Sequence, residues 1–471
     1  MKKIICFILM LMFLMFGVAY AGTVNLPQTG QKKCYDTNGT EIPCPGTGQD
    51  GANQAGVGWP APRFQVNGDC VTDSLTGLIW AKDANLPGST RDWYEAVGFC
   101  NNLTLCGYTD WRLPNVNELE SLINANEANS ATWLNAQGFT NVQASSYWSS
   151  TTYAVYQDYA WIVAMWIGYV GYDDKSSYPY NACVWPVRGG QQDVPDLAYP
   201  ANISKTGQTT SYATGDDGDL ERGVAWPSPR FADHGNGTVT DNLTGLMWTK
   251  NANLPNGYRT WQQALDYVSG MNAGAYPNLG YTDWRLPNRK ELHSLTDYST
   301  YIPALPAGHP FTNVQAYHYW SSTTDAYDPV YAWVVDMWDG DVSYDNKPDA
   351  YSYYVWPVRS GQIPTLIEIS SFTAAPSDRA VILKWTTATE IDNAGFNLYR
   401  LESENGEYVK INSSLIPAEG TSTSGATYQF IDSEVKNRTT YYYKLEDIDI
   451  NGVSTLHGPV SATPRVIHNL R

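Results

Sequence analysis

A long internal repeat constrains the fold of this 471-residue chain more than any other feature. Several segments recur almost unchanged, in the same order, about 170 residues later. They include Gly107–Asn115 with Gly280–Asn288, Tyr147–Thr152 with Tyr319–Thr324, and Val184–Arg188 with Val355–Arg359. A repeating unit of this length is a whole domain, because solenoid units are far shorter. We therefore expect two tandem copies of one domain, copy one at residues 22–191 and copy two at residues 192–362.

Each copy carries helical patterns followed by aromatic runs typical of strands. Apolar residues at helical spacing predict a core-packing helix beginning at Trp93 in copy one and at Trp261 in copy two. A second helix is expected to begin at Asn115 and at Asn288, because a glutamate follows each three residues later in the capping-box arrangement. Downstream, residues 159–170 and 331–342 predict antiparallel strands. This pattern makes each copy an α+β domain.

The last part of the chain, residues 363–471, has a different pattern. Runs of β-branched and aromatic residues alternate there with turn residues at regular spacing. Such a pattern favours an all-β immunoglobulin-like sandwich.

The N-terminal segment predicts export. Lys2 and Lys3 precede an apolar run from Ile4 to Phe16, and the small-residue triplet Ala19-Tyr20-Ala21 follows it. This arrangement is typical of a signal peptide, residues 1–21, cleaved after Ala21. The alternative is an uncleaved membrane anchor, which the cleavage triplet disfavours. The mature chain is thus expected to be secreted or held at the cell surface, with no membrane insertion after cleavage.

The charge of the chain limits its partners. Lys and Arg total 29 against 47 Asp and Glu, which gives a formal net charge of −18. A chain this acidic is not held on nucleic acid or on an anionic membrane by bulk charge. Aromatic residues make up 13% of the chain. Their flat, amphipathic rings suit binding surfaces as well as cores.

Six cysteines follow the predicted signal peptide, and an even number in an exported protein favours disulfides. Cys34 and Cys44 bracket a short segment and are expected to pair. Cys100 and Cys106 are also close in sequence and are expected to pair. By elimination Cys70 then joins Cys183.

One acidic loop in copy two is a candidate for calcium binding. Carboxylates cluster between glycines there, an arrangement that hard cations favour, and the candidate ligands are Asp216, Asp217, Asp219 and Glu221. Copy one has only Asp50 at the matching place. A second acidic loop, residues 233–241, is better explained as a β-turn whose Asn and Gly residues adopt positive φ. Calcium is therefore the one cofactor that the sequence suggests.

The repeated motifs carry a family resemblance. The Trp-Arg-Leu-Pro-Asn, Tyr-Trp-Ser-Ser-Thr and Val-Trp-Pro-Val-Arg segments of both copies resemble the Lcl C-terminal domain family of secreted bacterial proteins. The resemblance implies a C-type-lectin-like fold, and its best-known member is an adhesin for sulfated polysaccharides. Because both copies here are acidic, binding of polyanions does not carry over. In the last domain, Trp385 and the tyrosine run at 441–443 resemble fibronectin type III domains.

The same resemblance indicates where a ligand would bind. Lectin-like folds expose ligand loops at the positions of Trp166 and Tyr169 in copy one and of Trp338, Asp339 and Asp341 in copy two. Copy one has no histidine and copy two has no cysteine, so the copies share no Ser/His or Cys/His centre. We therefore expect a secreted, adhesin-like protein without catalytic activity that binds a surface glycan or a protein. The alternative is a structural matrix or envelope protein with no specific ligand.

Overall fold

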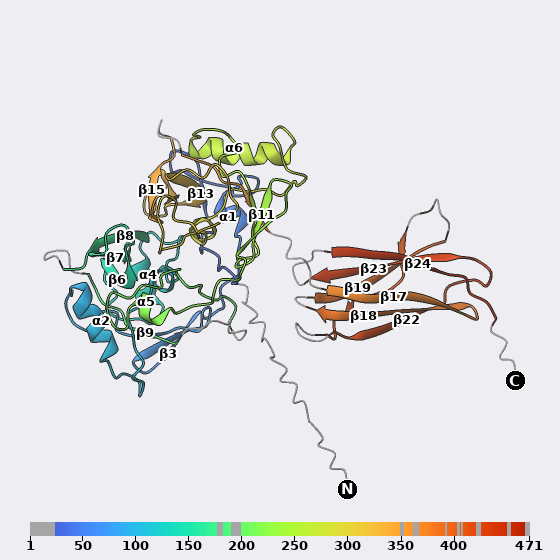
Figure 1. Cartoon of the computed structure of the whole chain (residues 1–471), viewed down its shortest axis with the longest axis horizontal. Helices are drawn as coiled ribbons and strands as arrows, with labels where there is room; N and C mark the ends of the chain where they lie inside the picture. The colour runs from blue at the N-terminus through green and yellow to red at the C-terminus, as the bar shows by residue number, and fades with distance from the viewer. Residues whose placement is uncertain are drawn as a thin grey trace, which may run out of the picture. The chain divides into compact units, whose positions relative to one another are not determined.

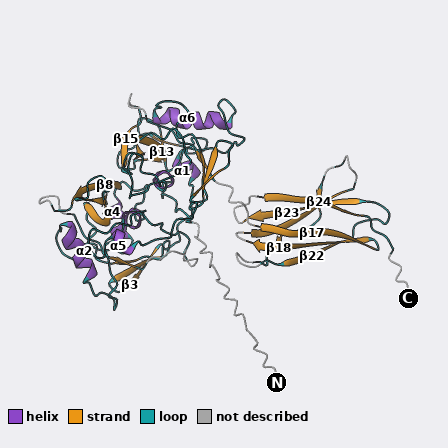
Figure 2. Cartoon of the chain, in the orientation of Figure 1, coloured by secondary structure: helices purple, strands orange, loops and turns teal. Residues whose placement is uncertain are grey.

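The computed structural model describes residues 24–176, 182–189, 199–348, 353–360, 367–390, 393–402, 406, 408–420, 425–449 and 454–466. The predicted signal peptide lies outside the described residues. The chain divides into two compact units, residues 1–361 and 362–471, and the first unit contains both copies. No helix within the described ranges combines the length and apolar character needed to cross a membrane. Strands predominate, with short helices among them (Figures 1 and 2).

Copy one and the segment before it contain short elements joined by many loops. They are β1 (Cys34–Tyr35), β2 (Glu41–Ile42), α1 (Asp50–Asn53), β3 (Phe64–Asn67), β4 (Cys70–Asp73), β5 (Ile79–Ala81), α2 (Trp93–Asn101), α3 (Val116–Glu120), α4 (Ser130–Ala136), β6 (Ser146–Thr152), β7 (Tyr159–Ala164), β8 (Tyr169–Asp174) and β9 (Val187–Arg188). The aromatic run predicted as strand is therefore two strands. The chain turns between them, and Gly168 adopts a φ of 97° there.

Copy two repeats this order, but its described residues show no counterparts of β1, β2 and α4. Its elements are α5 (Asp217–Leu220), β10 (Phe231–Asp233), β11 (Thr238–Asp241), β12 (Met247–Thr249), α6 (Trp261–Asn272), α7 (Arg289–His293), β13 (His318–Thr324), β14 (Tyr331–Asp336), β15 (Val342–Asn346) and β16 (Val358–Arg359). The loop predicted as a β-turn joins β10 to β11 as a hairpin, with Gly235 and Gly237 at positive φ. The predicted turn is present, but only its glycines, and not Asn236, adopt the positive φ that was expected of both.

The repeated motifs form the framework of each copy. Arg112 donates two hydrogen bonds of 2.6 Å to the carboxylate of Glu118, which also accepts the backbone N–H of Asn115 in a capping box at the start of α3. Arg285 and Glu291 pair in the same way beside the capping box of α7. Both helix starts predicted from the sequence are thus confirmed. The tryptophans of these motifs, Trp111, Trp185, Trp284 and Trp356, are all buried.

The two copies share one sheet. Its strand order is β13-β14-β15-β8-β7-β6, so each copy contributes three consecutive antiparallel strands. At the centre Val342 of β15 pairs antiparallel with Val170 of β8, which are equivalent positions in the two copies. The copies are therefore related by a pseudo-two-fold axis at this pair. Each copy also has its own four-stranded sheet, β3-β4-β5-β9 and β10-β11-β12-β16.

The N-terminal segment of each copy docks on the other copy, so the two segments are exchanged. The side-chain amide of Gln31 makes two hydrogen bonds with the backbone of Thr324 in copy two, at 2.7 and 2.9 Å. Gln208 makes the matching pair with Thr152 in copy one, at 2.8 Å each. Accordingly, α1 contacts β13 and α5 contacts β6. The same segments also bond to loops of their own copies, through Ala125 and Tyr298.

The second unit is a β-sandwich, as predicted. Its strands are β17 (Ile367–Ser377), β18 (Ala380–Glu390), β19 (Asn393–Leu401), β20 (Val409–Lys410), β21 (Ile416–Pro417), β22 (Thr427–Asp432), β23 (Tyr441–Asp449) and β24 (Ser454–Ala462). They form a β17-β18-β22 sheet and a β20-β19-β23-β24 sheet, with β21 paired to β19. One core cluster joins the two sheets, and in it Trp385 stacks on Tyr428 with ring centroids 5.1 Å apart.

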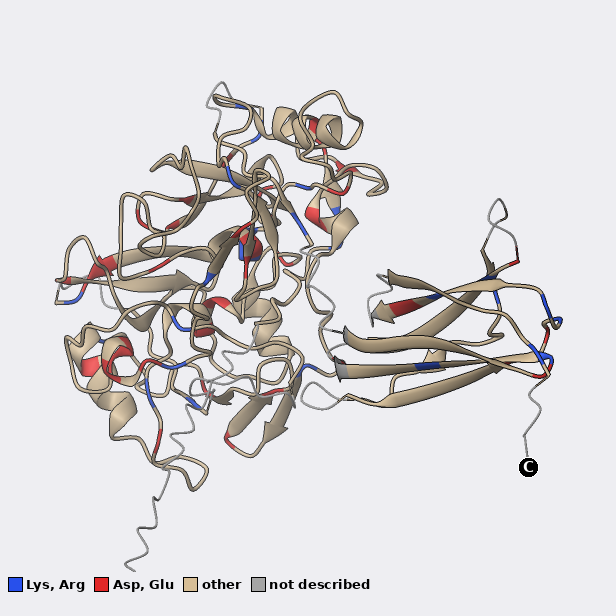
Figure 3. Ribbon diagram, turned by 45° about the vertical axis from the view of Figure 1, so that its right-hand side comes forward, with Lys and Arg blue, Asp and Glu red and all other residues tan. Residues whose placement is uncertain are grey.

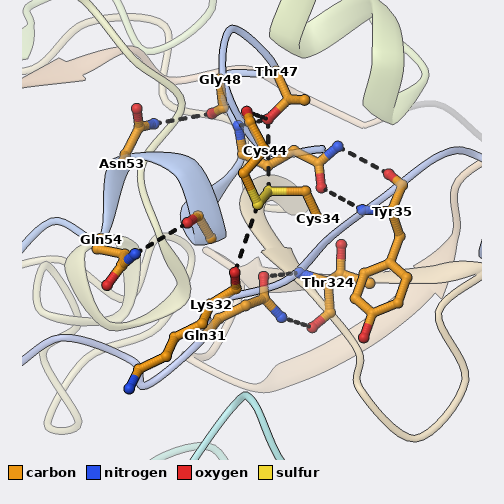
Figure 4. Close-up of a disulfide and its surroundings, with 12 residues drawn as sticks. Gln31, Lys32, Cys34, Tyr35, Cys44, Thr47, Gly48, Asn53, Gln54 and Thr324 are labelled. Atoms are coloured by element: carbon orange, nitrogen blue, oxygen red, sulfur yellow. Dashed lines mark hydrogen bonds between the residues drawn. A yellow bond between two sulfur atoms is a disulfide. The ribbon is translucent and has the colours of Figure 1, made fainter. Parts of the chain in front are cut away.

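Two disulfides are present among the described residues, and only one matches the prediction. Cys34 pairs with Cys44, as expected, and closes the loop shown in Figure 4. Cys70 pairs with Cys106, while Cys100 and Cys183 are free and buried. The predicted Cys100–Cys106 and Cys70–Cys183 bridges are therefore wrong. Cys100 lies on the buried face of α2, so its side chain points into the core instead of toward the loop that follows the helix.

Candidate functional site

The carboxylates of the acidic loop that was predicted to bind calcium already accept hydrogen bonds or form an ion pair within the chain. Asp216 caps α5 and accepts the backbone N–H groups of Asp219, Tyr212 and Ala213. Asp219 accepts the N–H of Gly215, and Glu221 pairs with Lys205 at 3.2 Å. The described residues contain no group of three or more His, Cys, Asp or Glu side chains that could hold a metal ion. Asp216 and Asp219 thus accept backbone N–H groups, and Glu221 pairs with a lysine, while calcium binding at this loop stays a prediction.

The remaining acid of that loop, Asp217, holds the exchanged segment in place. Its Oδ2 accepts hydrogen bonds of 2.7 Å from the hydroxyls of Thr151 and Thr206. Asp50 does the same in the other half, with Thr29 and Thr323 at 2.6 and 2.7 Å. Burial raises the pKa of Asp50 to about 6 and that of Asp217 to about 7, and the hydroxyl hydrogen bonds oppose the rise.

The copy-two residues predicted to bind ligand lie between the copies. Asp339 accepts a hydrogen bond of 2.8 Å from the hydroxyl of Tyr153, and Asp341 accepts one of 2.9 Å from Tyr169. Burial, followed by the charge of Asp339, raises the pKa of Asp341 to about 7. Burial also raises the pKa of Tyr153 and Tyr169. These groups are paired with each other across the copies, so a ligand would have to replace those bonds.

The two predicted tryptophans are half-buried rather than fully exposed. Trp166 follows β7, and Trp338 follows β14 at the same place in copy two. The ring of Trp338 lies 6.5 Å from that of Tyr301, which is exposed. The structure therefore leaves Trp166 and Trp338 near the surface while it buries the acid next to Trp338.

A group of tyrosines that the sequence analysis did not select is more exposed. In copy one Tyr172 of β8 stacks on the buried Tyr153 at 3.9 Å, and Tyr159 and Tyr156 extend the group with centroid distances of 6.0 Å. Tyr156 is 60% exposed and Tyr172 is 37% exposed. We call Tyr156, Tyr159 and Tyr172 the tyrosine patch of copy one.

Copy two repeats this feature. Tyr331 of β14 and Tyr344 of β15 meet edge to face at 5.5 Å and occupy the positions of Tyr159 and Tyr172. Tyr327, in the loop before β14, is 65% exposed. We call Tyr327, Tyr331 and Tyr344 the tyrosine patch of copy two. The repeated Tyr-Ala-Trp and Gly/Ser-Tyr-Asp segments were the sequence signal for both patches.

Charged residues also gather between α3 and α7, but they are paired. Glu120 bonds to Lys290 at 3.1 Å and lies 3.5 Å from Arg289, which stacks on Trp333. Burial lowers the pKa of the neighbouring His293 to about 4, so this imidazole is neutral at pH 7. Along the described part of the chain, the blue Lys and Arg segments lie interspersed with the red Asp and Glu segments (Figure 3).

Comparison with known proteins matches both copies to one family. The model of the Lcl C-terminal domain matches residues 69–188 and 237–359. An amylopullulanase of Thermoanaerobacter thermohydrosulfuricus is 30% identical over 125 residues, which are 26% of this chain and 8% of that protein. The chain thus spans a small fraction of the length of this curated relative.

Solved structures resemble the chain only weakly. The pectate lyase Pel3 of Pectobacterium carotovorum has a TM-score of 0.16 and 20% identity, with 20% of this chain and 26% of that chain covered. An Fn3-like protein of Clostridium thermocellum has a TM-score of 0.14 and 20% identity, with 21% of this chain and 98% of that chain covered. We base no argument on scores this low.

Proposed function

Since the chain belongs to the Lcl C-terminal domain family and carries this domain twice, we propose that it is a secreted glycan-binding protein without catalytic activity. The observation that carries the proposal is the tyrosine patch, exposed and present once in each copy. Sugar rings have apolar C–H faces and hydroxyl edges, and an exposed aromatic ring with polar neighbours suits both. Two equivalent patches on one molecule suit a polymer with a repeating structure.

Other features support export and an association with polysaccharides. Two disulfides fit an oxidising compartment. The relative named amylopullulanase is 30% identical to this chain over 125 residues. We further propose that each copy is a C-type-lectin-like module, because its helices precede its aromatic strands, and that the β-sandwich is fibronectin type III-like, because Trp385 packs in its core.

The proposal is tested by binding of the mature chain to a glycan array and to insoluble polysaccharides. We expect the combined substitutions Tyr156→Ala, Tyr172→Ala, Tyr327→Ala and Tyr344→Ala to reduce retention about tenfold or more, because they remove the exposed rings of both patches. Tyr94→Ala, which removes an exposed tyrosine of α2 outside the patches, is the matched control.

The alternative, a structural matrix or envelope protein, predicts no specific signal on the array. Binding that persists unchanged in the fourfold variant would contradict the assignment to the patches. Because the acidic loop is not part of the tyrosine patches, we expect the same signals with calcium chloride and with EDTA.

A further inference from the structure

Two insertions flank α6, one in the segment of copy one that docks on copy two and one in copy two itself. Thr29 and Asp50 are 21 positions apart, whereas their counterparts Thr206 and Asp217 are 11 apart, so the first exchanged segment is ten residues longer. The Cys34–Cys44 disulfide closes this extra loop. From Trp261 to Gly280 the chain is five residues longer than from Trp93 to Gly107. The second insertion follows α6.

The first insertion forms one wall of a hollow beside α6. The hollow has a volume of about 340 Å³ and lies between residues 46–49 and the helix. Its floor is apolar and consists of the buried Leu265, Val268, Trp284 and Leu286. Its rim on the helix is polar and exposed, with Gln262, Asp266 and Ser269 on successive turns.

The second insertion forms a hollow on the other flank of the same helix. It has a volume of about 430 Å³, and Asp266 lines it as well. Tyr276, from the insertion, is 46% exposed and stacks on Tyr267 of α6 with ring centroids 4.5 Å apart. Arg259 completes the hollow, and its guanidinium is fixed by the carbonyl oxygens of Tyr258 and Pro255.

A glycine lets the Tyr276 ring lie on the helix. A Cβ at Gly270 would meet the ring at 2.7 Å, closer than any real Cβ contact. Copy one has no counterpart of Tyr276, and Gly98 stands there in place of Asp266. The residues of the second insertion that line the hollow beside α6 therefore have no counterpart beside α2.

The lining indicates the chemical class of the ligand. An exposed tyrosine ring provides an apolar face, while the amides, the hydroxyl and the Asp266 carboxylate provide hydrogen-bond partners around it. Asp266 and Arg259 are the one acid and the one base of the second hollow, and Arg285, which lines the first hollow, is paired with Glu291. A neutral polyhydroxylated ligand matches this combination. A helix of the length of α6 spans about 18 Å, which suits a chain of sugars.

We propose that the two hollows beside α6 form one groove that binds a neutral oligosaccharide, with Asp266 contacting the ligand between them. This inference rests on the proposed glycan-binding function and names a second site, separate from the tyrosine patches. It gives copy two a ligand-binding role that copy one lacks.

The test is calorimetric titration of the intact mature protein with soluble gluco-, xylo- and manno-oligosaccharides of increasing length. Tyr276→Ala and Asp266→Ala are expected to weaken binding about tenfold. Gly270→Ala keeps the tyrosine but displaces its ring, and we expect a similar loss. Alanine is a stronger helix former than glycine, so this variant should keep its melting temperature. Gly98→Ala, in the matching helix α2 with open space around it, is the control.

Each outcome separates the groove from the patches. Loss in the three α6 variants, with Gly98→Ala and Tyr172→Ala unchanged, supports the groove. Loss in Tyr172→Ala with the α6 variants unchanged overturns the groove and leaves the proposed function standing. Equal binding by all variants also overturns the groove. No binding of any oligosaccharide or polysaccharide by the wild type overturns the proposed function and the groove together.

Discussion

At the scale of single residues, Asp50 and Asp217 are matching acids of the two halves whose pKa values the fold raises. Both are buried, and each accepts two threonine hydroxyls from different parts of the chain. The next residue, Gly51 or Gly218, lies so close to a backbone carbonyl that a Cβ would meet the oxygen at 2.3 or 2.0 Å. The Asp-Gly pair in each half is therefore a structural device that fixes the exchanged segment.

The raised pKa of Asp217 predicts a specific dependence of stability on pH. Its folded-state pKa of about 7 lies above the ordinary value of 3.8, so the folded protein holds this proton more tightly than the unfolded chain. The resulting stabilisation is complete below about pH 4 and is lost as the pH rises toward 7. The side chain of Asn does not titrate in this range. Between pH 4 and 7.5 we therefore expect the free energy of unfolding of Asp217→Asn to rise by about 2–4 kcal/mol relative to that of the wild type.

Urea denaturation of both proteins across this pH range measures the difference. Asp158→Asn changes an exposed acid of copy one, on which the segment of Asp217 docks, and is the control. Parallel curves for Asp217→Asn and the wild type would show that the carboxylate does not titrate in this window.

At the scale of elements, the local sequence pattern correctly predicted the helices, whose formation depends on residues close together in the chain. The capping boxes at Asn115 and Asn288 and the long helices at Trp93 and Trp261 follow from spacing along the chain, and the structure confirms them. The pairing of β8 with β15 joins residues 172 positions apart. Apolar residues recur every two residues in a strand and every 3.6 residues in a helix. This periodicity does not show whether an apolar face packs on its own copy or on the other copy. For that reason the shared sheet, and the burial of Asp339 and Asp341, were not predicted.

The cysteines show the same limit. The helical face that includes Trp93 and Ala96 also includes Cys100, so the predicted helix already pointed this thiol into the core. Pairing by closeness in sequence overrode that information. Cys106 adopts a φ of 53° just after the helix and reaches Cys70 of β4 instead.

This pairing predicts the number of free thiols. Mature protein denatured without reductant should release two titratable thiols per chain, from Cys100 and Cys183, and native protein should release none because both are buried. Thiol titration with a chromogenic disulfide measures the number. Cys100→Ser should reduce it to one. A value of zero in the denatured wild type would restore the three-bridge pattern.

The second bridge also contributes to stability. The Cys70–Cys106 bridge spans 36 positions, and on the chain-entropy model a loop of this size stabilises the fold by about 4 kcal/mol. We expect the free energy of unfolding of the double variant Cys70→Ser, Cys106→Ser, measured by urea denaturation, to fall by up to that amount. Cys183→Ser, which changes a buried thiol outside any bridge, separates the loss of the bridge from the cost of placing a serine in the core. An unchanged denaturation midpoint in the double variant would contradict the observed pairing.

At the scale of the whole first unit, the two copies form a linked pair and not two independent domains. The segment before copy one docks on copy two, and the segment before copy two docks on copy one. The shared sheet, the Tyr–Asp bonds across the copies and the pairing of Glu120 with Lys290 add to the same interface. Removing one partner of such buried pairs leaves charges and hydrogen-bonding groups unsatisfied, which is costly.

The exchange predicts how fragments of this unit behave. Residues 22–191 and 192–362 follow the repeat in the sequence, yet each lacks the segment that completes it. We expect either fragment alone to melt without a cooperative transition, and the two refolded together to form a one-to-one complex that melts cooperatively.

Residues 58–224 keep copy one with the segment that docks on it, including Gln208 and Asp217. This fragment should therefore be more stable than residues 22–191, although the two are of similar length. Calorimetry and analytical ultracentrifugation of the fragments make the comparison. Independent, cooperative melting of residues 22–191 as a monomer would show that the exchanged segments are not needed to complete each copy.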